Sequence, residues 1–286
     1  MSDDRPATPR RKLSLIAPLS IAAVGGAILL FAVLSRPDAP EVAAPPARPA
    51  PAPPAPIAAA PPPALTRADL VDAADLATTA FATGAKPATN RSPLIGRTFR
   101  LDIPFGCNGP RTGADGSQAF AEYDIDKGVL RLVARPVNLT ALPLVKDLDE
   151  TAGIEAVEGF WIPRPWAASE TCPPKRAFEV QATPSPPAAQ TLALAQVFET
   201  SGSRVSRRGD RPYEFVRKVD KADTSVLSHT YRLRLEGRLV GFKDGQAHHC
   251  WSESPDHRPI CLYAVAYDRV AFLDGDTGET LSEWRD

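Results

Sequence analysis

The chain has 286 residues, and its 33 basic and 34 acidic side chains give a formal net charge of −1. This near balance excludes a strongly basic, polyanion-binding protein, so we expect no nucleic-acid partner. The sequence is 43% hydrophobic, which is enough for one large folded domain, but its 31 prolines are spread unevenly and divide the chain into regions.

The N-terminal region combines a basic tail with an apolar run. Residues 1–12 end in two arginines and a lysine, and the run from Leu13 to Leu34 carries no charge. About 20 apolar residues span a bilayer core, so residues 13–35 are predicted to form one transmembrane helix. The basic residues before the run place the 1–12 tail in the cytoplasm. The alternatives are a cleaved signal peptide, whose apolar region is shorter, and a twin-arginine export signal.

Residues 36–64 consist mostly of proline and alanine. Such a segment cannot bury a core and favours an extended polyproline-II spacer. One helix, a proline-rich spacer and an outer domain form a layout that resembles TonB-type energy transducers. The resemblance covers only the first 64 residues and implies a domain projected away from the bilayer. A passive tether is the simpler alternative to a recognition site for a proline-binding partner.

The remaining residues, 65–286, are expected to form the periplasmic domain, beginning with a helix over Thr66–Phe81. Thr66 is a suitable N-cap, and Asp69 three residues later completes a capping box. Leu70 belongs to a thin apolar face, and Gly84 is a suitable helix stop.

From residue 96 onward the hydrophobic period changes to two, which is typical of half-buried strands. Ala119–Ile125 and Val129–Arg135 flank Asp126-Lys127-Gly128 and predict a hairpin. Leu192–Phe198 suits either a helix or a strand. Val270–Trp284 suggests a single strand-turn-strand, whose acidic turn lacks the glycine of an EF-hand calcium loop. The other predicted strands, punctuated by Gly237 and Gly245, are Phe99–Ile103, Ile154–Ile162, Ala177–Gln181, Tyr213–Val219, Thr230–Leu235, Arg238–Phe242, Ile260–Tyr267 and Arg269–Leu273.

These short strands and polar turns predict a fold that is mainly β or α+β, with an antiparallel sandwich or barrel-like sheet. All four cysteines follow the apolar run, and an even number in an oxidising compartment indicates two disulfides. Three pairings are possible. The favoured one joins Cys250 to Cys261, closing a short loop between two strands, and Cys107 to Cys172.

A metal site is the alternative use of the same region. His248, His249 and His257 lie near Cys250 and Cys261, and zinc takes imidazole and thiolate ligands. The spacing matches no standard zinc motif, and adjacent histidines on a strand point to opposite faces. We therefore expect no cofactor.

Two further groups suggest a ligand-binding surface. Arg207 and Arg208 belong to the densest basic stretch, although interleaved acids favour a solvated loop. Trp161 and Trp166 lie among prolines and could stack on a ligand, although aromatic residues of this kind more often anchor a core or a loop.

No nucleophile elbow, HExxH, P-loop or GxGxxG motif occurs in the sequence. We therefore expect a single-pass protein of the bacterial inner membrane whose periplasmic domain acts in interaction or scaffolding, with another envelope protein as its partner. The alternatives are an extracytoplasmic metal-dependent hydrolase built on the three histidines and a small-ligand or glycan-binding module. The sequence does not fix the oligomeric state.

Overall fold

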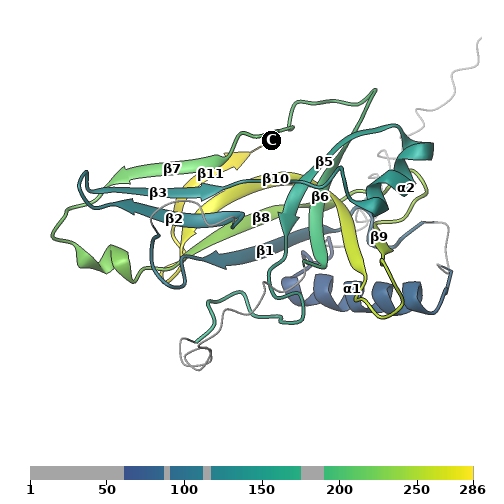
Figure 1. The fold of residues 1–286 in the computed structure, drawn as a ribbon, viewed down its shortest axis with the longest axis horizontal. Helices are drawn as coiled ribbons and strands as arrows, with labels where there is room; N and C mark the ends of the chain where they lie inside the picture. The colour runs from purple at the N-terminus through teal and green to yellow at the C-terminus, as the bar shows by residue number, and fades with distance from the viewer. Residues whose placement is uncertain (1–60, 87–90, 112–116, 175–189, 286) are drawn as a thin grey trace, which may run out of the picture. The chain divides into compact units, whose positions relative to one another are not determined.

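The computed structural model describes residues 61–86, 91–111, 117–174 and 190–285 (Figure 1). The chain divides into two units, Met1–Ile57 and Ala58–Asp286, and every described residue belongs to the second. The predicted membrane helix, most of the spacer and the predicted strand Ala177–Gln181 lie outside the described residues. Within the described ranges, no helix is long and apolar enough to cross a bilayer.

Helix α1 spans Arg67–Ala82 and confirms the helix predicted from the capping pattern. The Thr66 side chain accepts a hydrogen bond from the backbone N–H of Asp69, and the Asp69 carboxylate accepts one from the N–H of Thr66 at 2.8 Å. The helix buries Leu70, whose carbonyl accepts a hydrogen bond from the Tyr263 hydroxyl at 3.1 Å. This contact ties α1 to one face of the large sheet.

The large sheet has eight strands among the described residues, and the long strand β10 is shared by its two halves. The first residues of β10 pair with β6 and β9, and its last residues pair with β8 and β11. The order is β1-β8-β10-β6-β5-β4, formed by Thr98–Phe105, Tyr231–Leu239, Ile260–Asp274, Leu192–Glu199, Ile154–Trp161 and Val137–Asn138, with β9 (His248–Trp251) and β11 (Thr280–Arg285) beside β10.

Two predicted strand breaks are wrong. The predicted pair Thr230–Leu235 and Arg238–Phe242 is one strand, β8, with Gly237 inside it. A Cβ at Gly237 would lie 2.1 Å from the carbonyl oxygen of Ala266, so glycine here permits close strand approach rather than a turn. The predicted break in β10 is a register shift between Tyr267 and Arg269, typical of a β-bulge.

The ambiguous segment Leu192–Phe198 is a strand, and it is parallel to β10. The sheet is therefore not wholly antiparallel. Residues 192–195 are all buried, and a strand covered on both faces has a continuous hydrophobic pattern instead of alternation. This pattern explains why the segment could not be distinguished from a helix in the sequence.

A second, three-stranded sheet contains β2 (Ala119–Asp124), β3 (Val129–Ala134) and β7 (Tyr213–Lys218). The hairpin predicted at Asp126-Lys127-Gly128 is confirmed by the register of β2 and β3. Buried residues of this sheet share one core with β1, β8 and β10, and Figure 1 shows the small sheet lying over the β8–β11 half of the large one. Neither sheet closes on itself within the described ranges, so the barrel-like alternative is not found and the fold is mainly β.

A second core lies on the other face of the large sheet. Helix α2 spans Pro143–Ala152, which the sequence analysis missed, and packs Leu144 and Val145 near Val157 and Leu262. Leu262 alternates along β10 with the residues that face α1, so α1 and α2 cover opposite faces of this part of the sheet.

Candidate functional site

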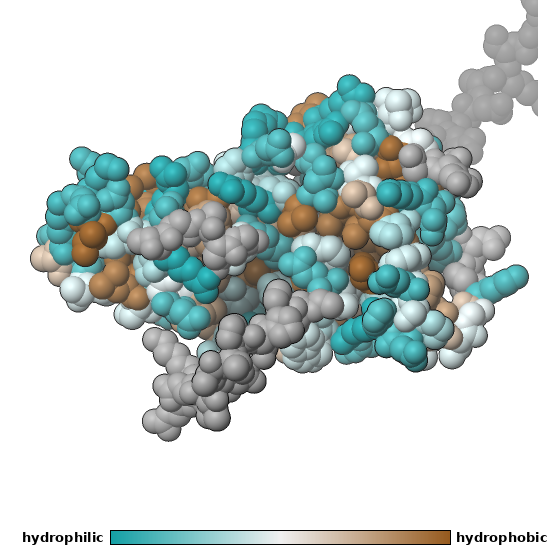
Figure 2. All heavy atoms as spheres, viewed as in Figure 1, coloured by the Kyte–Doolittle hydropathy of each residue, from teal (hydrophilic) through white to brown (hydrophobic). Residues whose placement is uncertain are grey.

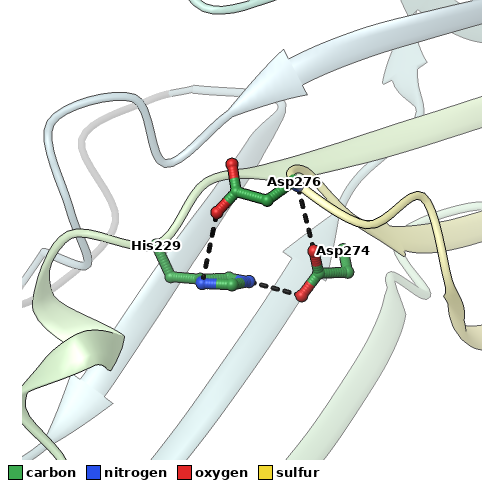
Figure 3. A group of neighbouring side chains, drawn as sticks. All are labelled: His229, Asp274 and Asp276. Atoms are coloured by element: carbon green, nitrogen blue, oxygen red, sulfur yellow. Dashed lines mark hydrogen bonds and ion pairs between the residues drawn. The ribbon is translucent and has the colours of Figure 1, made fainter.

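One imidazole lies between two carboxylates at the end of the large sheet (Figure 3). His229 precedes β8, Asp274 ends β10, and Asp276 belongs to the turn before β11. The His229 Nε2 atom lies 2.5 Å from an Asp274 carboxylate oxygen, and Nδ1 lies 3.8 Å from an Asp276 carboxylate oxygen. The Gly275 N–H also donates to the Thr230 carbonyl at 2.9 Å, so the two segments are joined by backbone as well as side chains.

The Asp274 carboxylate is held in its ionised form. Burial opposes ionisation, but hydrogen bonds from the Thr277 N–H, the His229 side chain and the Asp276 N–H outweigh it and lower the pKa of Asp274 to about 2. Both backbone donors reach one carboxylate oxygen, while the imidazole contacts the other.

These three side chains are the one group of potential metal ligands that the described part of the chain brings together. Two ligand atoms, each about 2.1 Å from a tetrahedral zinc ion, lie about 3.4 Å apart. The 2.5 Å contact between His229 and Asp274 is shorter, and the two ring nitrogens face different carboxylates. The arrangement is thus a hydrogen-bonded clamp between two loops, and the imidazole would have to turn away from Asp274 to bind an ion.

The predicted histidine cluster is not assembled. His248 and His249 project from β9 in different directions, as expected for neighbours on a strand. The His248 ring lies 5.2 Å from that of Tyr263, and the His249 ring lies 4.7 Å from that of Phe242. Burial, followed by the neighbouring His249, lowers the pKa of His248.

The third predicted histidine, His257, lies in the loop between β9 and β10. Its Nδ1 atom is 3.3 Å from the Ser254 hydroxyl oxygen. The neighbouring thiols are also unavailable as metal ligands, because Cys250 and Cys261 form a disulfide.

Both predicted disulfides are confirmed. Cys250 and Cys261 are direct partners in the β9–β10 register, and Cys107 is joined to Cys172 across 65 positions of sequence. None of the four cysteines is free. Two disulfides in one domain are typical of an oxidising compartment outside the cytoplasm.

The predicted binding arginines contact carboxylates of strand β5. Arg207 lies 2.7 Å from Glu155 and 3.2 Å from Glu158. The buried Glu158 carboxylate also accepts hydrogen bonds from the backbone N–H groups of Arg208 and Gly209, both at 3.0 Å. This network anchors the basic loop to the sheet and directs the two arginines toward internal partners.

The Arg208 guanidinium lies 4.3 Å from the centre of the Tyr213 ring. The predicted binding tryptophans differ from one another. Trp166 is 58% exposed, whereas Trp161 is 6% exposed and lines a pocket.

This pocket, with a volume of about 320 Å³, lies between the end of β1, the start of β2 and the end of β5. Its apolar wall includes Phe105, Phe120 and Trp161. Gln118, also in the wall, is fixed by its side-chain amide, which accepts from the Trp161 N–H at 2.8 Å and donates to the Trp161 carbonyl. Cys107 lines the pocket too, so the long-range disulfide holds part of its wall.

Comparison with known proteins adds no assignment: no family model matches the sequence, no curated protein matches it, and no solved structure matches the fold. The site must therefore be interpreted from its own geometry.

Sequence reasoning missed both arrangements for the same reason. His229 and Asp274 are 45 positions apart, and Gln118 and Trp161 are 43 apart, with no short motif joining either pair. The acidic turn was considered only as a calcium loop. Of the pocket residues, Trp161 was named as a possible ligand contact and Cys107 only as a disulfide partner.

Proposed function

We propose that the domain is an extracytoplasmic binding module that recognises another envelope protein through the pocket at Phe105, Phe120 and Trp161. In this proposal, the helix over residues 13–35 anchors the chain in the bacterial inner membrane, and the spacer over residues 36–64 carries the domain into the periplasm. The pocket is the observation that carries the proposal.

The dimensions and chemistry of the pocket support a protein partner. Ligand pockets measure roughly 300–1,000 Å³, so this one is at the lower end and fits one or two apolar side chains of a partner. Its apolar wall supplies the hydrophobic contact, while exposed hydrophobic residues elsewhere are scattered among hydrophilic ones, as Figure 2 shows for one face. The fixed amide of Gln118 and the nearby disulfide keep the wall in place before binding.

The geometry gives less support to the alternative of a metal-dependent hydrolase. A hydrolytic metal needs about three protein ligands around one point. The three predicted histidines do not converge: each contacts a different residue, His248 with Tyr263, His249 with Phe242 and His257 with Ser254. A small ligand is the second candidate for the pocket, because the apolar wall would accept an apolar group of a small molecule as well as an apolar side chain of a protein.

The test uses the full-length chain expressed in bacterial cells with a photoreactive amino acid in place of Ser117, an exposed residue at the pocket. The matched control carries the same amino acid in place of Arg238, which is exposed on β8. We expect an envelope-protein adduct of defined mass at Ser117 only, and a weaker adduct when Phe120→Ala removes part of the wall. Identical adducts at both positions, or none at Ser117, would contradict the proposal.

A further inference from the structure

Strand β7 is an edge of the small sheet. Among the described residues its one strand partner is β3, in the register Ala134↔Tyr213 to Val129↔Lys218. Unpaired edge strands present backbone donors and acceptors to another chain and are a recurrent site of strand addition.

The register identifies which backbone groups of β7 are free of the β3 ladder. The Val219 N–H donates to the Gly128 carbonyl at 2.9 Å, in continuation of the β3–β7 register. In an antiparallel ladder, hydrogen-bonded pairs alternate with pairs whose N–H and C=O groups point outward. The backbone groups of Glu214, Val216 and Lys218 therefore point away from β3.

The side chains of the same three residues lie on the solvent face of the strand. Val216 is 50% exposed, whereas Tyr213 on the opposite face is buried in the core. The edge thus presents an acidic, an aliphatic and a basic side chain at every second residue, and the residues between them, the half-buried Phe215 and the exposed Arg217, point to the other face of the sheet.

We propose that a second copy of this chain pairs with this edge, β7 against β7 about a two-fold axis at Val216, to form a six-stranded antiparallel sheet. In this register Val216 faces its own copy, and Glu214 of each copy faces Lys218 of the other. Phe215 faces Arg217 on the inner side. Each copy presents the same surface to the other, as a two-fold interface requires.

Charge selects this register over its neighbours. The outward backbone groups occur at every second residue, so the copies can slide only in steps of two residues. One step places Arg217 opposite its own copy and Glu214 opposite Asp220, both like-charge pairs. A slide of two residues in the other direction places Glu214 opposite Val216, so Glu214 and Lys218 no longer face each other. Opposite charges directly across a strand pair are stabilising and like charges are destabilising.

The experiment measures the oligomeric state of the full-length chain in mild detergent by light scattering during size-exclusion chromatography. The wild type is expected to be a dimer. Lys218→Glu places acids opposite acids and should raise the dissociation constant about tenfold or more. Glu214→Lys places bases opposite bases with the same result, although it also removes an ion pair with Arg131 at 3.2 Å.

A mixture of the two single variants provides the decisive arm. The acidic edge of Lys218→Glu and the basic edge of Glu214→Lys are complementary, so the mixture should form heterodimers at concentrations at which each variant alone is largely monomeric. This result also demonstrates that both variants are folded. Failure of the mixture to associate would overturn the proposal, as would a monomeric wild type or a Lys218→Glu variant that dimerises normally.

A backbone variant tests the strand pairing itself. Val216→Pro removes an outward N–H, which β3 does not use, and proline is tolerated on edge strands in this position. We expect a folded monomer with an unchanged circular dichroism spectrum. Arg238→Glu, a charge reversal on β8 away from this edge, should remain dimeric, and loss of the dimer there would show that the effect is one of net charge.

Discussion

Asp102 lies in β1 with only 2% of its surface exposed. Its two carboxylate oxygens accept hydrogen bonds from Arg234 at 2.7 and 2.8 Å, and Arg232 lies 3.7 Å away. The Asp102 N–H donates to the Glu170 carboxylate at 3.0 Å, so a side chain covers a backbone donor on this edge strand. Burial raises the pKa of Glu170, partly opposed by that hydrogen bond.

Replacing Asp102 by alanine should lower the free energy of unfolding by about 3 kcal/mol, because two partly buried guanidinium groups lose their counter-charge. Denaturation in urea measures the change. The matched control is Asp268→Ala, which breaks an ion pair with Arg238 whose two side chains are 50% and 53% exposed, and which should cost about 0–1 kcal/mol. Equal losses in the two variants would contradict this interpretation.

Asp274 predicts an acid-dependent loss of stability. Its pKa falls from an ordinary 3.8 to about 2 on folding, so the unfolded chain binds the proton more readily. The stabilisation is complete above about pH 4 and is lost as the pH falls toward 2. Linkage gives about 2 kcal/mol, and solvent screening at this turn reduces it to about 1–2 kcal/mol. The difference in unfolding free energy between wild type and Asp274→Asn should narrow over this range, and a constant difference would contradict the assignment.

At the scale of elements, alternation and capping were sufficient for much of the fold. The capping box placed α1 within one residue of its observed bounds, and the period of two located most of the strands. The predicted strand ends were wrong where a glycine was interpreted as a turn. The sequence alone does not distinguish Gly237, which lies inside a strand, from a glycine in a turn until the partner strand is known. Cysteine counting and strand placement predicted the disulfides, whereas the pocket required the packing of distant strands.

Gly237→Ala tests the close approach of β8 and β10. A methyl group there meets the Ala266 carbonyl oxygen at 2.1 Å, so one strand must shift, and we expect a loss of about 3 kcal/mol in thermal or urea denaturation. Gly84→Ala is the control: no atom lies within 4 Å of the added group, and only its positive φ of 66° costs about 1 kcal/mol. A larger effect at Gly84 would refute the close-approach explanation.

At the scale of the whole molecule, the two disulfides close loops of very different length. In the chain-entropy model, the 65-residue separation of Cys107 and Cys172 corresponds to about 4 kcal/mol, and the 11-residue separation of Cys250 and Cys261 to about 3 kcal/mol. We expect the double alanine variant of the first pair to be the less stable, and also to weaken the adduct at Ser117. Unchanged cross-linking at Ser117 in this variant would show that the pocket does not depend on the Cys107–Cys172 disulfide.

The proposed anchor gives a prediction about fractionation. Deleting residues 13–35 and supplying a cleavable export signal should move the protein from the alkali-resistant membrane fraction to the soluble periplasm, since in the proposal this apolar run is the segment that spans the bilayer. The full-length chain is the control, and its release by alkali would count against the anchor.

The place of β10 also bears on the order in which the chain is made. This strand lies between β8 and β6, yet it follows both of them in the sequence and is synthesised after them. Neither β8 nor β6 has its inner neighbour until β10 emerges, so the large sheet cannot be completed before residues 260–274 have been made. On the proposed route, the polypeptide threads through the export channel before this sheet can close. One member of the Cys250–Cys261 pair lies in β10. Oxidation of this pair would then mark the point at which a newly exported molecule completes its large sheet.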